Sequence, residues 1–101
     1  MSLDEISAEL FAAAKAGNVQ RVLWCIAQEA DVNWACVAEQ KKTAVHVSCE
    51  GGHVEVLECL LLNGASILVL DEKDLAPLDY AQREDTSDDC VSVLISYSSH
   101  G

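Results

Sequence analysis

The stretch TAVHVSCEGGHVEVLECLLLNGA, residues 43–65, predicts two short helices joined by a tight turn. Thr43 is a suitable N-cap for the first helix because its hydroxyl can accept a hydrogen bond from a free backbone N–H group. Gly51 and Gly52 end that helix, since a tight C-terminal turn needs the positive φ that glycine adopts easily. The second helix is expected over residues 54–62, with an apolar stripe at i, i+3 and i+4 made of Leu57, Leu60 and Leu61. Both helices are shorter than the roughly 12–15 residues at which isolated helices become marginally stable, so neighbours must stabilise them.

The same pattern recurs on both sides of this stretch. Residues 12–22 align with residues 47–57, and residues 43–46 align with residues 76–79. A spacing in the range of about 20–50 residues is typical of stacked repeats, each made of one supersecondary unit. Each unit here consists of two short helices and an extended connector, so the core is expected to lie between neighbouring units.

Five motifs resemble those of the ankyrin repeat family. They are TAVH at 43–46 for the family's T-P-L-H, GH at 52–53 for its turn, VLECLL at 56–61 for its V-V-x-L-L-L helix, ADVN at 30–33, and PLDYA at 77–81, which resembles closing repeats. The resemblance covers residues 8–97. It implies an all-α ankyrin repeat solenoid of about three helix-turn-helix repeats with connecting β-turn or hairpin loops. Residues 1–101 are then a single domain, with repeats at about 8–40, 41–73 and 74–97.

The same resemblance implies a protein-protein interaction module or adaptor that binds through its concave face and connector tips, with no catalysis of its own. DVNW at 31–34 and LDYAQ at 78–82 are further similar to the ankyrin segments of Arf GTPase-activating proteins. In size the chain is similar to small free-standing adaptors such as myotrophin. The alternative function is therefore a regulatory ankyrin segment of a larger signalling protein such as an Arf GTPase-activating protein.

The connectors depart from the family pattern. The first connector, residues 34–42, is two residues longer than the second connector, residues 69–75, and Asp74 stands where the family usually has glycine. Connector tips of ankyrin proteins project toward the concave side, and an exposed aromatic residue such as Trp34 is typical of binding hot spots. The register places Tyr80 on an inner helix that faces the same concavity. The expected partner-binding residues are Trp34, Lys41, Lys42, Glu50, Val69, Glu72, Lys73 and Tyr80.

The chain is strongly acidic, with 17 Asp and Glu against 6 Lys and Arg and a formal net charge of −11. Such a charge disfavours nucleic acid and anionic membrane surfaces and favours another protein with a basic segment as the partner. Eight acidic side chains between positions 71 and 89 form either a solvated face or a docking surface for that segment; they are Asp71, Glu72, Asp74, Asp79, Glu84, Asp85, Asp88 and Asp89.

Catalytic and metal sites find little support in the sequence. His46 and Cys49 are one helical turn apart, the spacing at which a base could activate a thiol. The resemblance instead implies that His46 is a structural histidine that hydrogen-bonds with Thr43 at the helix start, and that Cys49 fills a small core position. No tight C-x-x-C spacing is present, so neither a metal nor a cofactor is expected.

Compartment is inferred from the termini and the cysteines. The N-terminus is acidic where a leader would be basic, and no apolar run approaches the roughly 18–20 residues that a membrane span needs. The five cysteines are an odd number without paired spacing, which favours reduced buried thiols. The expectation is a monomeric cytoplasmic protein, with a nuclear location as the other possibility, and no membrane insertion.

Overall fold

The computed structural model describes residues 2–83 and 88–98, and its helices follow one another in pairs. The pairs are α1 (Leu3–Ala16) with α2 (Val19–Ala27), α3 (Ala44–Glu50) with α4 (Val54–Leu62), and α5 (Pro77–Ala81) with α6 (Asp88–Ser98). A single 3-10 turn, η1 (Val37–Glu39), lies in the first connector. Within the described ranges there is no β-strand, only an isolated bridge between Cys36 and Lys42. The predicted all-α repeat fold is confirmed, and the repeat boundaries stay a prediction.

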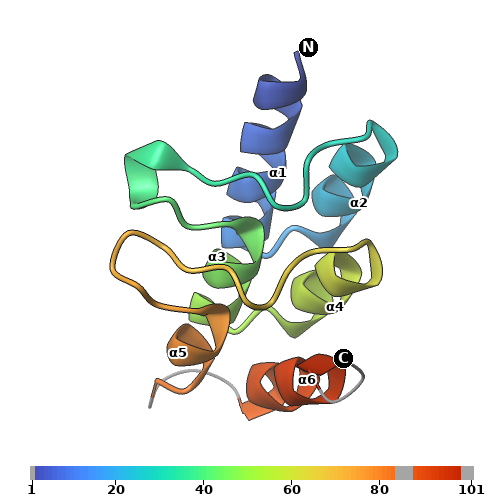
Figure 1. The fold of residues 1–101 in the computed structure, drawn as a ribbon. Coiled ribbons are helices and arrows are strands. Elements are labelled where there is room, and N and C mark those ends of the chain that lie inside the picture. The colour runs from blue at the N-terminus through green and yellow to red at the C-terminus, as the bar shows by residue number, and fades with distance from the viewer. Residues whose placement is uncertain (1, 84–87, 99–101) are drawn as a thin grey trace.

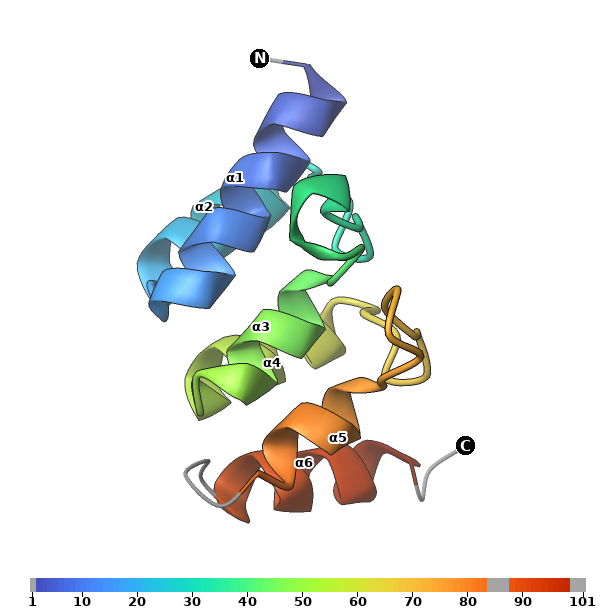
Figure 2. The ribbon, with the colours of Figure 1, turned by 90° about the vertical axis from the view of Figure 1, so that its left-hand side faces the viewer.

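The pairs stack in two layers (Figure 1). The inner helices α1, α3 and α5 pack on one another in sequence, and the outer helices α2, α4 and α6 do the same behind them. Figure 2 shows the inner helices toward the viewer and both connectors projecting to the same side. The face that the inner helices and the connectors share is called the inner face below.

Local sequence chemistry explains where the helices begin and end. The Ser2 hydroxyl accepts from the Glu5 backbone N–H at 3.2 Å, a capping box that starts α1 well before the expected repeat boundary at residue 8. Gly17 ends α1 and Gly52 follows α3, both with positive φ near 70°. Pro77 opens α5, where the missing N–H of proline costs no hydrogen bond.

The core runs continuously along the stack. The predicted stripe of α4 is fully buried, with Leu57 and Leu60 both at 0% exposure. A hydrogen bond also joins the first repeat to the second: the Ser66 N–H donates to Asn33 Oδ1 at 2.7 Å. Within the first repeat, the Asp31 backbone N–H donates to the Ser7 hydroxyl of α1 at 2.9 Å. Each repeat therefore depends on its neighbour both for burial and for the position of its connector.

The connectors are held in defined conformations. In the first connector the Cys36 N–H donates to the Lys42 carbonyl at 2.8 Å, which closes a hairpin-like loop, and Gln40 and Lys41 both have positive φ. In the second connector Asp74 has φ 61°, so aspartate occupies the left-handed position where the family usually has glycine. The Glu72 N–H donates to the Gln40 carbonyl at 2.8 Å and fastens the two tips to each other.

Candidate functional site

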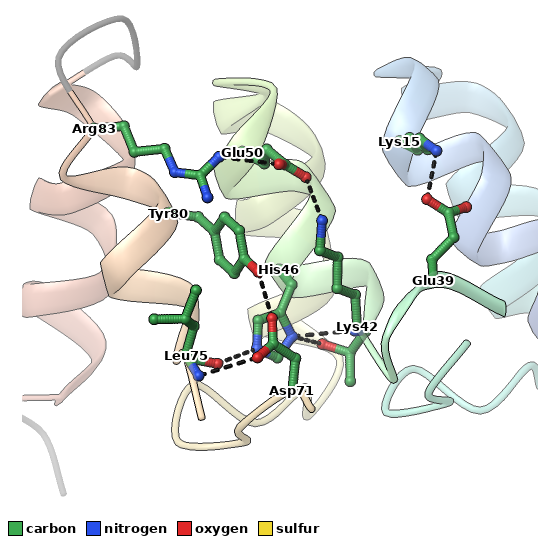
Figure 3. A network of polar contacts seen from close by, with 10 residues as sticks. Lys15, Glu39, Lys42, His46, Glu50, Asp71, Leu75, Tyr80 and Arg83 are labelled. Atoms are coloured by element: carbon green, nitrogen blue, oxygen red, sulfur yellow. Dashed lines mark hydrogen bonds and ion pairs between the residues drawn. The ribbon is translucent and has the colours of Figure 1, made fainter. Parts of the chain in front are cut away.

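Five side chains of alternating charge form a row along the inner face (Figure 3). Lys15 of α1 binds Glu39 of the first connector at 2.5 Å, while Lys42 and Arg83 both bind Glu50 of α3, each at 3.1 Å. The hydrogen bond to Glu39 and, more weakly, the charge of Glu50 raise the pKa of Lys15. We call these five residues the charged row. It spans all three repeats and contains three cations but two carboxylates.

Tyr80 lies beneath the charged row and is 1% exposed. Its ring lies between two cations, with Lys42 Nζ 5.0 Å and the Arg83 guanidinium carbon 4.4 Å from the ring centroid. Its hydroxyl donates to the Asp71 carboxylate. The expectation that Tyr80 would face a partner therefore needs correction: the ring supports the cations from below and offers no surface of its own.

Asp71 is a hub, meaning a buried carboxylate that accepts several hydrogen bonds, rather than part of an exposed acidic surface. It is 4% exposed and accepts from the Tyr80 hydroxyl and from the backbone N–H groups of Lys73 at 2.9 Å and Leu75 at 3.0 Å. Burial opposes its ionisation, but these hydrogen bonds outweigh burial and lower the pKa of Asp71. Asp71 therefore fixes the second connector. Of the eight acidic residues, Glu84 and Asp85 lie outside the described residues.

His46 is bound on both ring nitrogens. The Thr43 backbone N–H donates to Nδ1 at 3.1 Å, so Nδ1 is an acceptor and the Nε2–H group donates to the Leu75 carbonyl at 3.0 Å. Burial lowers the pKa of His46, and burial raises the pKa of the Cys49 thiol. A neutral, fully bonded imidazole beside a buried thiol that resists ionisation is a poor nucleophile pair, and it fits the structural role that the resemblance implied.

Stability should fall on acidification because His46 is neutral in the folded chain. With the pKa lowered from its usual 6.5, the unfolded chain binds a proton there that the folded chain does not. The free energy of unfolding should therefore decrease as pH falls from about 7.5 to about 5.5. Denaturant titrations at the two pH values measure this decrease. His46→Gln should be less stable and should lose most of the pH dependence; an undiminished dependence in that variant would contradict the assignment.

Trp34 is half-buried rather than exposed. Its indole packs against Phe11 of α1 in an edge-to-face arrangement, with ring centroids 6.0 Å apart, and it belongs to the partly buried rim of the core. The insertion in the first connector thus brings an aromatic side chain back onto the first repeat. Trp34 can present only part of its ring to a partner.

Trp34→Ala should accordingly reduce stability and not only binding. Loss of the aromatic pair and its buried area should lower the free energy of unfolding by about 1–3 kcal/mol. Denaturant unfolding of the variant beside Val37→Ala, whose side chain is 73% exposed, measures the difference. Equal stability of the two variants would show that the contact with Phe11 contributes nothing.

The other expected binding residues lie at the connector tips, at the base of the second connector or within the charged row. Lys41, Glu72 and Lys73 are exposed at the connector tips, which the bond between Glu72 and Gln40 brings together, and Val69 is half-buried at the base of the second connector. Lys42 and Glu50 are half-buried within the charged row. The structure thus gathers six of the eight expected residues on the inner face, with Trp34 and Tyr80 packed behind it.

Sequence reasoning missed Lys15, Glu39 and Arg83, the remaining members of the charged row. Lys15 and Glu39 are 24 positions apart, and Glu50 and Arg83 are 33 positions apart. The second separation equals one ankyrin repeat, so comparison of equivalent positions in successive repeats could have found that pair. No local pattern signals the first.

Basic residues are concentrated on the inner face. Of the six in the chain, Lys15, Lys41, Lys42, Lys73 and Arg83 lie in the charged row or at the connector tips. The sixth, Arg21 of α2, binds Glu9 and stacks on Trp24, 4.1 Å from the centre of the ring. Trp24 lies on the outer layer with 39% of its surface exposed.

No group of three or more metal-ligating side chains gathers anywhere in residues 2–83 and 88–98. Across the same ranges, every helix is too short or too polar to cross a membrane. All five cysteines are free.

Paired antiparallel helices stacked in two layers, with connectors projecting from one side, define a helical repeat solenoid. The family model for ankyrin repeats, in three copies, matches residues 10–101. The chain belongs to the ankyrin repeat family.

Three relatives illustrate where similar repeats occur. Over 72 residues the chain is 35% identical to "Arf-GAP with coiled-coil, ANK repeat and PH domain-containing protein 2" of Gallus gallus, covering 71% of this chain and 9% of that protein. It is 30% identical over 78 residues to "ARF GTPase-activating protein Git" of Drosophila melanogaster, covering 77% and 10% respectively. It is 31% identical over 59 residues to "Histone-lysine N-methyltransferase EHMT1" of Mus musculus, covering 58% and 5%. The chain thus spans a tenth or less of these relatives.

Proposed function

We propose that this chain binds a partner protein on its inner face and connector tips and performs no catalysis of its own. The observation that carries the proposal is the rigid placement of exposed polar tips. The two connectors are hydrogen-bonded to each other through Glu72 and Gln40, and the second is fixed from below by Asp71. Side chains held in place before association lose little conformational entropy on binding.

Backbone strain at the tips supports the same surface. Gln40, Lys41 and Asp74 all have positive φ, which is unfavourable for residues other than glycine and which concentrates at ligand-binding sites. The proposed contact residues are Lys41, Glu72 and Lys73 at the tips, with Val69, Lys42 and Glu50 behind them. Trp34 contributes the part of its side chain that stays exposed, and Tyr80 contributes indirectly by holding Lys42 and Arg83 in position.

The relatives favour a second form of the proposal. The chain is similar to a segment of two proteins named as Arf GTPase-activating proteins and covers about a tenth of each. In this form the repeats are a regulatory segment of a larger signalling protein, and the partner is either another domain of that protein or a protein that the segment recruits. The same inner face would serve in both forms.

For compartment, we propose a reducing environment, cytoplasmic or nuclear, and a chain that is monomeric by itself. The five free cysteines support this proposal, because disulfides form readily in secreted proteins. Sedimentation equilibrium under reducing conditions tests the monomer.

Affinity capture from a cell extract tests the proposed surface. The tip variant combines Lys41→Asn, Glu72→Ala and Lys73→Ala, with asparagine chosen because it tolerates the positive φ of Lys41. A matched control with the same change in net charge places Gln20→Glu, Gln28→Ala and Ser92→Ala on exposed positions of the outer layer. The partner captured by the wild-type chain should bind the tip variant at least about tenfold more weakly. It should bind the control variant as tightly as it binds the wild type. Normal capture by the tip variant with loss in the control would place the interface on the outer layer.

A further inference from the structure

Resting on the proposed function, we propose that the charged row binds an acidic segment of the partner, with partner carboxylates on Arg83 and Lys15. These two cations stand at the ends of the row, and their side chains remain 47% and 54% exposed despite their ion pairs. The bound segment would lie across all three repeats, from Lys15 near the end of α1 to Arg83, two residues beyond α5.

The balance of charges within the row supports an anionic ligand. Lys42 and Arg83 share the single carboxylate of Glu50, while the buried carboxylate of Asp71 is already bound by the Tyr80 hydroxyl and by backbone N–H groups. Among the side chains of the row itself, the cations at this end outnumber the carboxylates by one. Arginine carries five N–H donors in a planar fork that matches a carboxylate in two-point geometry. A partner aspartate or glutamate can therefore bind Arg83 without displacing Glu50.

The row also arranges its cations rigidly in advance. Tyr80 stacks against both Lys42 and Arg83, and Asp71 holds the Tyr80 hydroxyl, so the two cations lie on a fixed aromatic support. Glu39 in turn holds Lys15 against the first connector. Cations positioned before binding require little ordering when the partner arrives.

The charge of the whole chain makes this face selective. A net charge of −11 repels acidic partners in general, while five of the six basic residues lie in the charged row or at the connector tips. Glu39, Glu50, Glu72 and Asp74 share this face with the five cations, so an acidic segment is repelled less there than over the rest of the chain. Electrostatic complementarity of this kind sets orientation more than affinity. The sequence instead favoured a basic partner because of eight acidic residues between positions 71 and 89, of which Asp71 is buried and Glu84 and Asp85 lie outside the described residues.

Selection from a library of random peptides displayed on phage tests the proposal without knowledge of the partner. The wild-type chain is compared with the row variant, Lys15→Gln with Arg83→Gln. The matched control, Gln20→Glu with Ser92→Glu, changes net charge equally on exposed outer-layer positions. Thermal unfolding confirms that each variant is folded.

Peptides selected by the wild-type chain should be enriched in Asp and Glu relative to the starting library. Synthetic copies should bind the row variant about tenfold more weakly, and the control without change, with affinity that falls as salt is added. Enrichment in Lys and Arg, or acidic peptides that bind the row variant normally, would overturn the proposal while leaving protein binding intact. If no selected peptide competes with the captured partner, the proposal that the partner binds through an acidic segment is overturned. Loss of that partner from the outer-layer control alone would instead overturn the proposed function.

Discussion

Leu60→Ala is expected to lower the free energy of unfolding by about 2–5 kcal/mol, because truncation leaves a cavity that the surrounding helices cannot fill. Leu60 lies on α4 at 0% exposure, where α4 packs against α2, α3 and α6. The loss should appear in denaturant unfolding as a lower midpoint with an unchanged slope.

An exposed leucine on the same helix provides a matched control for this prediction. Leu62 belongs to the same helix but is 75% exposed, so Leu62→Ala should change stability by no more than about 0.5 kcal/mol. Equal effects of the two substitutions would mean that the buried stripe of α4 has been assigned to the wrong positions.

Asp71→Ala is expected to reduce stability by about 3 kcal/mol. The substitution leaves the Tyr80 hydroxyl and the backbone N–H groups of Lys73 and Leu75 without their acceptor, and unsatisfied buried donors cost about 1–3 kcal/mol each. Loss of the hub should also loosen the second connector and the aromatic support of Lys42 and Arg83.

Two variants separate these effects. Glu72→Ala removes a neighbouring carboxylate from an exposed position, and its free energy of unfolding should stay within about 0.5 kcal/mol of the wild type. Tyr80→Phe removes one donor and leaves the ring stacked between the cations, so its cost should be smaller than that of Asp71→Ala. A stability of Asp71→Ala equal to that of Glu72→Ala would show that Asp71 is not a hub.

The helix pairs could be predicted from sequence because local chemistry determines them. The second helix was expected over residues 54–62 and α4 occupies Val54–Leu62, since its apolar stripe and the flanking glycines act over a few residues. Asp74 was noted to stand where the family usually has glycine, and its positive φ agrees with that place in the repeat. A repeat architecture makes the remaining fold easier to predict, because a unit that matches the family pattern closely indicates how its neighbours stack.

The site was harder to predict because its contacts join distant parts of the chain. Asp71 looked like one of several surface acids, yet Tyr80 and the backbone of its own turn enclose it. Aspartate at the start of the turn DEKD could have signalled this role, since aspartate often accepts from backbone groups two or more residues ahead.

Trp34 illustrates the same difficulty for an aromatic residue. Its position in a connector indicated exposure, but the sequence does not show that the longer loop folds back against Phe11. For the charged row, the pairing of Lys15 with Glu39 depends on how α1 and the first connector meet, which only the assembled stack determines.

Amide hydrogen exchange of the chain with and without its captured partner tests most directly whether the inner face is the interface. Exchange should become slower on binding in residues 36–43 and 69–75, which contain the two connector tips and the N-cap of α3. No change is expected in α2 and α4 of the outer layer. Protection confined to α2 and α4, with the connectors exchanging as in the free chain, would contradict the account.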